Sequence, residues 1–140
     1  MRYGNGQVAL SADQLAWMPA YYLLTVAVEL SVLWFALSKR HPARVKLFAG
    51  FWLTACTYPV LWLVLPPFFD TRWLYLLVGE TVVPVAECGL FWAAFVRRLP
   101  PDRRATTRDI LAIVAANLAS FAFGLLLEVV LSLDAIRRLG

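Results

Sequence analysis

The sequence predicts an all-α polytopic membrane protein, an up-down bundle of four transmembrane helices. Of its 140 residues, 61% are apolar and only 16% are charged, and the mean hydropathy is +0.69. A soluble domain has about 45–50% apolar and about 25% charged residues. Lys, Arg and His are absent from four long stretches, 3–38, 47–71, 73–96 and 109–136. Each stretch can supply the roughly 20 residues that cross about 30 Å of hydrocarbon.

We expect a single domain, residues 1–140, with spans at approximately 16–38, 45–65, 72–96 and 108–132. The connections between these spans are short, which predicts that consecutive helices are antiparallel neighbours. The first 15 residues are polar and lack the charged start and apolar block of a cleavable signal peptide. The first span is therefore expected to act as its own signal.

Caps and prolines predict the ends of the first two helices. Ser11 and Gln14 have the spacing of a capping box, and Pro19 is expected to kink the first helix or to begin it afresh. Pro42 suits the first position of the second helix, where a missing N–H costs nothing. The pair Pro66–Pro67 is expected to end that helix.

The last two helices have similar signals. Asp70 is the expected N-cap of the third helix, which should end near Leu99. Thr106 is the expected cap of the fourth, with Asp109 near the positive end of its dipole. His41 lies in a basic loop before a proline, where we expect it to be a cap or solvated.

Basic residues are concentrated in two loops. Loops 39–46 and 97–108 contain nine Lys and Arg residues. The other side has four: Arg2, Arg72, Arg137 and Arg138. The positive-inside rule predicts an inner or plasma membrane protein with both of these loops cytoplasmic and both termini outside. Topology and anionic lipid account for this charge, and without a recognition motif nucleic acid is not an expected partner.

Polar side chains inside the spans are the candidate functional residues. At about 1.5 Å per residue from the nearest basic loop residue, one group from each helix falls at a depth of about 13–15 Å. These are Glu29, Cys56, Glu87 and Asn117. A second set lies nearer the outside: Tyr58, Glu80, Ser120 and Glu128. The half beside the basic loops has aromatic residues instead: Trp34, Phe35, Phe51, Trp52, Phe91, Trp92 and Phe95. This gradient predicts a polar cavity that opens outward and is closed inward.

Two carboxyl groups share one face of the third span. Glu80 and Glu87 are seven residues apart, and Pro84 between them frees the carbonyl of Glu80 and permits a kink. In the second span Pro59 would likewise free the carbonyl of Ala55. A freed carbonyl at this depth is tolerated where it lines a cavity.

Carboxyl groups at membrane depth need partners, and two interpretations remain open. Some can be neutral and hydrogen-bonded between helices, for example Glu87 to Asn117. Alternatively, a bound cation or a partner protein's basic residue supplies the missing charge. Glu128 is closer to the outer boundary, which favours a solvated interfacial residue.

Other polar residues also have structural explanations. Asn117, Ser120 and Gly124 form a stripe typical of helix packing. Cys56 and Cys88 are typical small apolar fillers, although their similar depth would permit a soft-metal pair with Glu87. The chain has no CxxC or Cys/His metal motif, and we predict no cofactor.

The sequence favours a cation- or proton-linked transporter or channel over an enzyme. The expected binding residues are Glu29, Tyr58, Glu80, Glu87, Asn117 and Ser120. Four helices hardly enclose a wide aqueous path, so we expect a homo-oligomer or a membrane-protein partner. The alternative is a non-catalytic assembly subunit, and a third is a lipid- or isoprenoid-handling protein. HExxH, GxSxG and Gly-rich phosphate motifs are absent from the sequence, which leaves chemistry based on carboxylates alone as the enzymatic alternative.

Overall fold

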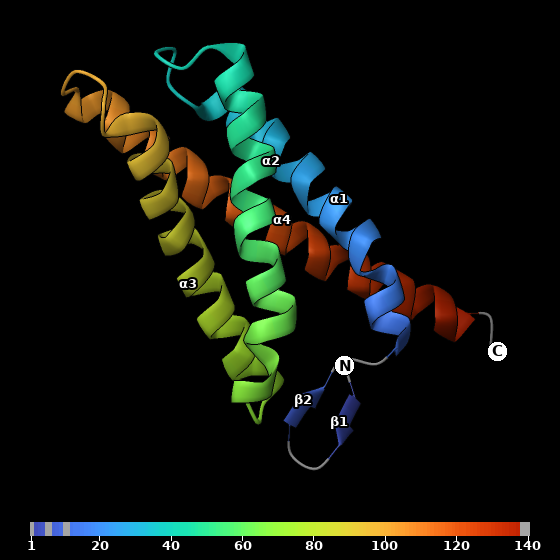
Figure 1. Ribbon diagram of the computed structural model, residues 1–140. Helices are drawn as coiled ribbons and strands as arrows, with labels where there is room; N and C mark the ends of the chain where they lie inside the picture. The colour runs from blue at the N-terminus through green and yellow to red at the C-terminus, as the bar shows by residue number, and fades with distance from the viewer. Residues whose placement is uncertain (1, 5–6, 10–11, 138–140) are drawn as a thin grey trace.

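Four long helices dominate the structure, a computed structural model (Figure 1). It describes the backbone of residues 2–4, 7–9 and 12–137 and the side chains of residues 16–131. The helices are α1 Ala12–Ala36, α2 Ala43–Pro59, α3 Arg72–Phe91 and α4 Arg103–Arg137. All four are long and apolar enough to cross a membrane, over Ala16–Ala36, Ala43–Val64, Arg72–Val96 and Arg103–Leu131.

Short helical segments extend α2 and α3. The π-helical turns η1 (Val60–Val64) and η3 (Trp92–Val96) follow α2 and α3, and the 3-10 turn η2 (Pro66–Phe68) precedes α3. A π-helical turn leaves backbone groups without their usual helical partners. In η1, the carbonyl oxygen of Leu61 accepts a hydrogen bond of 2.8 Å from the hydroxyl of Tyr75 on α3.

The structure adds a small hairpin to the predicted helices. Strands β1 (Arg2–Gly4) and β2 (Gln7–Ala9) are antiparallel, with Arg2 opposite Ala9, and β2 lies beside η2. We had expected only a polar segment here. The sequence does hold a signal, because the Asn-Gly dipeptide at positions 5 and 6 is the strongest short-range indicator of a hairpin.

The ends of the first three helices differ from the predictions in detail. Ser11 of the expected capping box lies outside the described residues. Helix α1 continues unbroken through Pro19, so it does not begin afresh there. Pro42 is the N-cap of α2, one position before the predicted one. The N-cap of α3 is Thr71, so the prediction of Asp70 was wrong by one residue.

Two further boundaries concern the end of η3 and the start of α4. The π-helical turn η3 ends at Val96, the last residue of the expected span 72–96 and three residues before Leu99; its last bond runs from the N–H of Arg97 to the carbonyl of Trp92 at 2.8 Å. Helix α4 begins at Arg103, and its cap is Asp102, whose Oδ1 accepts a bond of 3.0 Å from the N–H of Ala105. Thr106 therefore lies within α4.

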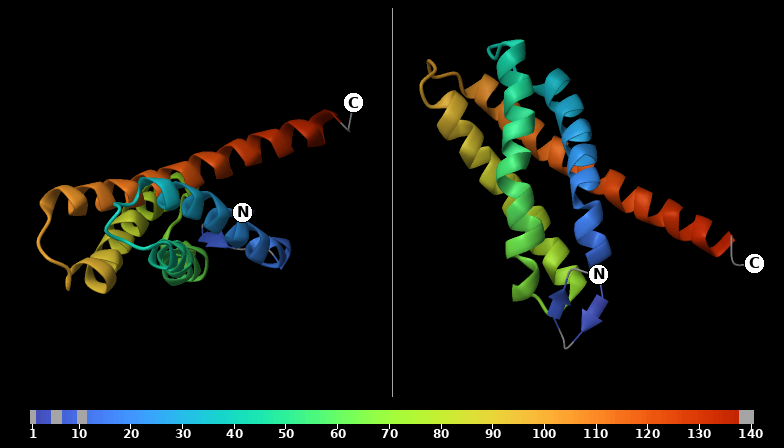
Figure 2. Two further views of the ribbon diagram at one scale, coloured as in Figure 1. Left: turned by 90° about the horizontal axis from the view of Figure 1, so that it is seen from above. Right: turned by 45° about the vertical axis from the view of Figure 1, so that its right-hand side comes forward.

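Helices α1, α2 and α3 lie on one side of α4, which crosses them at an angle (Figure 2). The connections at 37–42 and 97–102 are at one end, and η2 and the hairpin are at the other (Figure 1). Helices α1 and α2 approach closely at Gly50, where a Cβ atom would lie 2.7 Å from Leu30 Cδ1. This approach places the next turn of α2 beside the polar residues of α1.

Candidate functional site

The site begins with a buried carboxyl group on α1. Glu29 is only 4% exposed. Its Oε2 lies 2.6 Å from Thr54 Oγ1 on α2, and its Oε1 lies 2.9 Å from Ser120 Oγ on α4. One carboxyl group thus connects three helices.

A second carboxyl group repeats this arrangement from α3. Glu87 is 2% exposed. Its Oε1 lies 2.7 Å from Thr57 Oγ1 on α2, and its Oε2 accepts a hydrogen bond of 2.7 Å from Asn117 Nδ2 on α4. The hydrogen bond between Glu87 and Asn117 that the sequence suggested is therefore present.

The spacing of the partners on α2 and α4 explains why the two carboxyl groups are adjacent. Thr54 and Thr57 are three residues apart on α2, and Asn117 and Ser120 are three apart on α4. Residues at this spacing lie on one helix face. Each carboxyl group is bonded to one residue from each pair. Helices α1 and α3 thus supply the acids, and helices α2 and α4 supply the side chains that are hydrogen-bonded to them.

Glu29 has partners that fit both of its protonation states. Thr54 Oγ1 is also 2.9 Å from the carbonyl oxygen of Gly50, and Ser120 Oγ is 2.9 Å from that of Asn117. Each hydroxyl group has one proton to donate. Ionised Glu29 can accept from both hydroxyl groups. Protonated Glu29 can donate to one of them, which then turns its own proton to the backbone carbonyl.

The partners of Glu87 differ in one respect. Thr57 Oγ1 is 2.7 Å from Glu87 and 3.1 Å from the carbonyl oxygen of Leu53, so it can make the same exchange. Asn117 Nδ2 has two protons and can donate to Glu87 and to the carbonyl of Ile113, at 3.0 Å, at the same time. Glu87 therefore has one exchangeable partner and one permanent donor.

A cavity of about 170 Å³ lies beside these carboxyl groups. Its lining includes five of the six residues predicted to bind an ion: Glu29, Tyr58, Glu80, Asn117 and Ser120. The sixth, Glu87, borders it through Thr57 and Asn117, which also line the cavity. The cavity continues from this layer along the helix halves that point away from the 37–42 and 97–102 connections, past Tyr21, Trp62 and Gly124.

The threonines of α2 were missed in the sequence, which drew attention to Cys56 and Tyr58 instead. Tyr58 is buried, but its hydroxyl donates to the carbonyl of Met18 at 3.1 Å. Cys56 is half-buried between the two threonines along the chain. The T-x-x-T spacing matches N-x-x-S on α4, and this parallel was the available signal.

The cysteines gain no support as metal ligands. Cys88 Sγ lies 3.9 Å from the carbonyl oxygen of Ile110 and is half-buried. Over the part of the chain whose side chains are described, no three His, Cys, Asp or Glu side chains converge in a way that could hold a metal ion.

The other half of the bundle is closed by an apolar core. The core consists of Leu33, Leu37, Ala49, Leu53, Phe91, Val96, Ala112, Ile113 and Ala116. Of the seven aromatic residues that the sequence placed in this half, Phe91 is fully buried, and Trp52 and Phe95 pack against the core. The rest are exposed on the outside of the helices: Trp34, Phe35, Phe51 and Trp92. Aliphatic side chains and one phenylalanine therefore close the cavity, in place of a complete aromatic layer.

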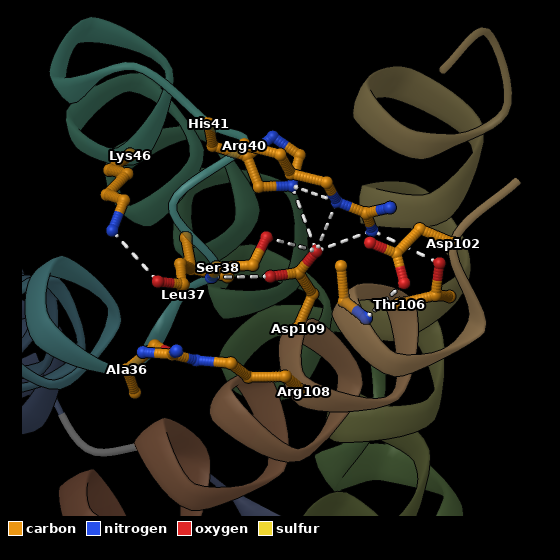
Figure 3. Close-up of polar contacts among 11 residues, drawn as sticks. Ala36, Leu37, Ser38, Arg40, His41, Lys46, Asp102, Thr106, Arg108 and Asp109 are labelled. Carbon is orange, nitrogen blue, oxygen red and sulfur yellow. Dashed lines mark hydrogen bonds and ion pairs between the residues drawn. The ribbon is translucent and has the colours of Figure 1, made fainter. Parts of the chain in front are cut away.

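A charged cluster joins the 37–42 connection to α4 (Figure 3). Asp109 is fully buried and accepts from the N–H of Ser38 at 2.7 Å and from Arg40 Nη2 at 2.6 Å. His41 Nε2 lies 3.0 Å from the same carboxylate, and Arg40 Nη2 also donates to Thr106 Oγ1 at 3.2 Å. His41 is 5% exposed, so the prediction of a solvated or capping histidine was wrong.

Two basic side chains hold the end of α1. Lys46 Nζ donates to the carbonyl of Leu37 at 2.9 Å, and Arg108 Nε donates to that of Ala36 at 2.8 Å (Figure 3). Cations are favourable at a helix C-terminus, where carbonyl groups lack helical partners. Some of the charge in the basic loops thus has a structural role.

At the opposite end, Glu128 forms an ion pair with Arg72, with 2.5 Å between Oε2 and Nη2. Both side chains are about half exposed. Glu128 is therefore exposed and paired with Arg72, and its location at a membrane interface stays a prediction.

The fold and the site define a class of protein: four helices of membrane-spanning length around a pair of buried carboxyl groups. Comparisons of the chain with protein-family models, with curated proteins and with solved structures gave no match.

Proposed function

We propose that the chain is an integral membrane protein with loops 39–46 and 97–108 in the cytoplasm and both termini outside. The four candidate spans and the nine basic residues of these loops support this orientation. In this orientation, an up-down order of the spans leaves the cavity in the outer half of the membrane. The apolar core then lies between the carboxyl groups and the cytoplasm.

Within this protein, Glu29 and Glu87 exchange protons or bind a small cation, as part of a transporter or channel. The observation that carries the proposal is the set of exchangeable hydroxyl groups around two carboxyl groups buried beside a cavity. A carboxyl group that served only as interhelical glue would need partners for one protonation state. Partners for both states allow a proton to leave and return without helix movement.

The size of the cavity restricts the ligand. Pockets for drug-sized molecules have volumes of about 300–1,000 Å³, whereas this one has about 170 Å³. That volume holds several water molecules or one small cation. Glu80 lines the same cavity and supplies a third carboxyl group between the two buried ones and the outside.

The test is proton release from purified protein when Na⁺, K⁺, divalent metal ions or small organic ammonium ions are added. We expect release from the wild type and none from Glu29→Gln or Glu87→Gln. Glutamine reproduces the shape and donor of a protonated glutamate, so both variants should fold. Glu128→Gln, at an exposed carboxyl group, is the matched control and should release protons as the wild type does. Equal release from all four proteins, shown to be folded by circular dichroism, would refute the proposal.

The alternative, an assembly subunit, is favoured by the second half of α4. This part of α4 extends beyond the other helices (Figure 2), and its large apolar side chains are exposed. They are Phe123, Leu125, Leu126, Val129, Val130 and Leu131. Lipid can cover such side chains as well as a protein can, so the feature that favours a second copy or another membrane protein is that none of the other described helices covers this part of α4. Light scattering in mild detergent that shows a stable, folded monomer with cation-dependent proton release would exclude this role.

A further inference from the structure

A basic groove lies where the end of α1 meets the start of α4, at the opposite end of the molecule from the hairpin. Its volume is about 750 Å³. The polar part of its lining consists of Arg103, Arg104, Thr107 and Arg108. None of the described residues that line the groove is acidic. The neighbouring Asp109 does not line the groove, because its carboxylate points toward Ser38 and forms an ion pair with Arg40 (Figure 3).

The groove changes from basic to apolar along α4. Leu111 and Ala115 follow Arg103 by eight and twelve residues, which places them about 12 and 18 Å further along the helix. Leu111 is 63% exposed, and Ala36 of α1 and Ala112 complete the wall. An exposed apolar wall therefore begins directly below the arginines, within the candidate span Arg103–Leu131.

The three arginines of the groove differ in how firmly their side chains are held. Arg108 donates to the carbonyl oxygens of Ala36 at 2.8 Å and Phe35 at 3.4 Å, which fixes its guanidinium group at the junction of the helices. Arg103 and Arg104 are exposed in the first turn of α4, directly after its cap Asp102. The positive charge is thus concentrated at the boundary between water and the apolar wall.

We propose that this groove binds an anionic phospholipid. Its phosphate lies between Arg103, Arg104 and Arg108, and one acyl chain lies along Leu111 and Ala115. A soluble anion would use the arginines and leave the wall uncovered, whereas a neutral lipid would use the wall and leave the arginines unpaired. Only an amphipathic anion matches both parts of the groove.

The test is native mass spectrometry of the purified full-length protein, with phosphatidylglycerol and phosphatidylcholine of the same acyl chains. Arg103→Gln with Arg104→Gln removes two charge-assisted contacts with the phosphate and should weaken phosphatidylglycerol binding by more than about 25-fold. Arg97→Gln with Arg98→Gln removes the same charge at the same end of the molecule, but neither side chain lines the groove. This control loses only the general attraction of basic residues for anionic lipid and should weaken binding clearly less than the first pair does. Arg108 is left intact because it holds the end of α1.

A second variant tests the apolar wall. Ala115→Trp should weaken phosphatidylglycerol binding and leave the binding of inorganic phosphate unchanged. If both double arginine variants lose phosphatidylglycerol binding equally, the lipid is attracted by the overall positive charge of this end of the molecule, and the proposal is overturned. Displacement of the lipid by inorganic phosphate at equal concentration, or equal binding of phosphatidylcholine, would overturn it as well. Circular dichroism shows that each variant compared is folded.

Discussion

Asp109→Asn should destabilise the fold strongly, although asparagine has the same shape as aspartate. Oδ1 of Asp109 accepts from the N–H of Ser38, and Oδ2 accepts from Arg40 and lies 3.0 Å from His41 Nε2. In asparagine one of these oxygens becomes an NH₂ group. Whichever position the NH₂ group takes, it faces a donor, either the N–H of Ser38 or the guanidinium group of Arg40.

The expected loss follows from the burial of this cluster. Removal of one partner from a buried ion pair costs about 3–5 kcal/mol. The side chain of Asp109 is 0% exposed and that of Arg40 is 16% exposed, so some water reaches the arginine. We therefore expect the lower end, about 3 kcal/mol, or roughly a hundredfold in the folding equilibrium.

The assay is reversible unfolding of purified protein in mixed micelles with increasing dodecyl sulfate, followed by circular dichroism. Asp102→Asn is the matched control, because Asp102 is an exposed cap with a hydrogen bond to Ala105. Asparagine caps helices as well as aspartate does, so the control should lose less than about 0.5 kcal/mol. The reasoning fails if the two variants have the same free energy of unfolding.

Three further predictions concern helix contacts and can use the same unfolding assay. Gly50→Val should cost about 1–3 kcal/mol by overpacking, because a Cβ atom at this position would lie 3.3 Å from the backbone Cα of Leu30 as well as 2.7 Å from its Cδ1; a stability equal to that of the wild type would contradict this close backbone approach. Thr54→Val should cost about 1 kcal/mol and Thr54→Ser clearly less, since only serine keeps the hydroxyl group bonded to the buried carboxyl group; equal losses would show that the hydroxyl group is unimportant. Glu128→Gln should cost less than about 1 kcal/mol because its ion pair with Arg72 is half exposed; a larger loss would show that this ion pair is not an ordinary surface pair.

The sequence identified the helices well because the signals for them are local. Stretches without basic residues mark the spans, and Pro42 and Pro66 lie beside the ends of α2 and η1. The same residue counting placed Glu87 and Asn117 at one depth, and these residues do form a hydrogen bond. Depth along a helix follows from the rise per residue, so it needs no knowledge of the neighbouring helices.

The sequence could not identify the partners, because they depend on how the helices are rotated against each other. Thr54 and Thr57 resemble ordinary helix residues until α1 and α3 bring a carboxyl group to each. His41 resembles a solvated loop residue until α4 brings Asp109 against it.

By itself, the sequence determined four apolar helices, the segregation of basic residues into two connections, and a layer of polar side chains halfway along the spans. The tertiary structure decided which hydroxyl group serves which acid, that Asp109 is buried in an ion pair, and that the core beyond the site is mainly aliphatic. Hydrophobic length and charge are properties of a segment, and a sequence displays them directly. A hydrogen bond between helices is fixed by their rotation and close approach, which only the packing of side chains such as Leu30 against Gly50 determines.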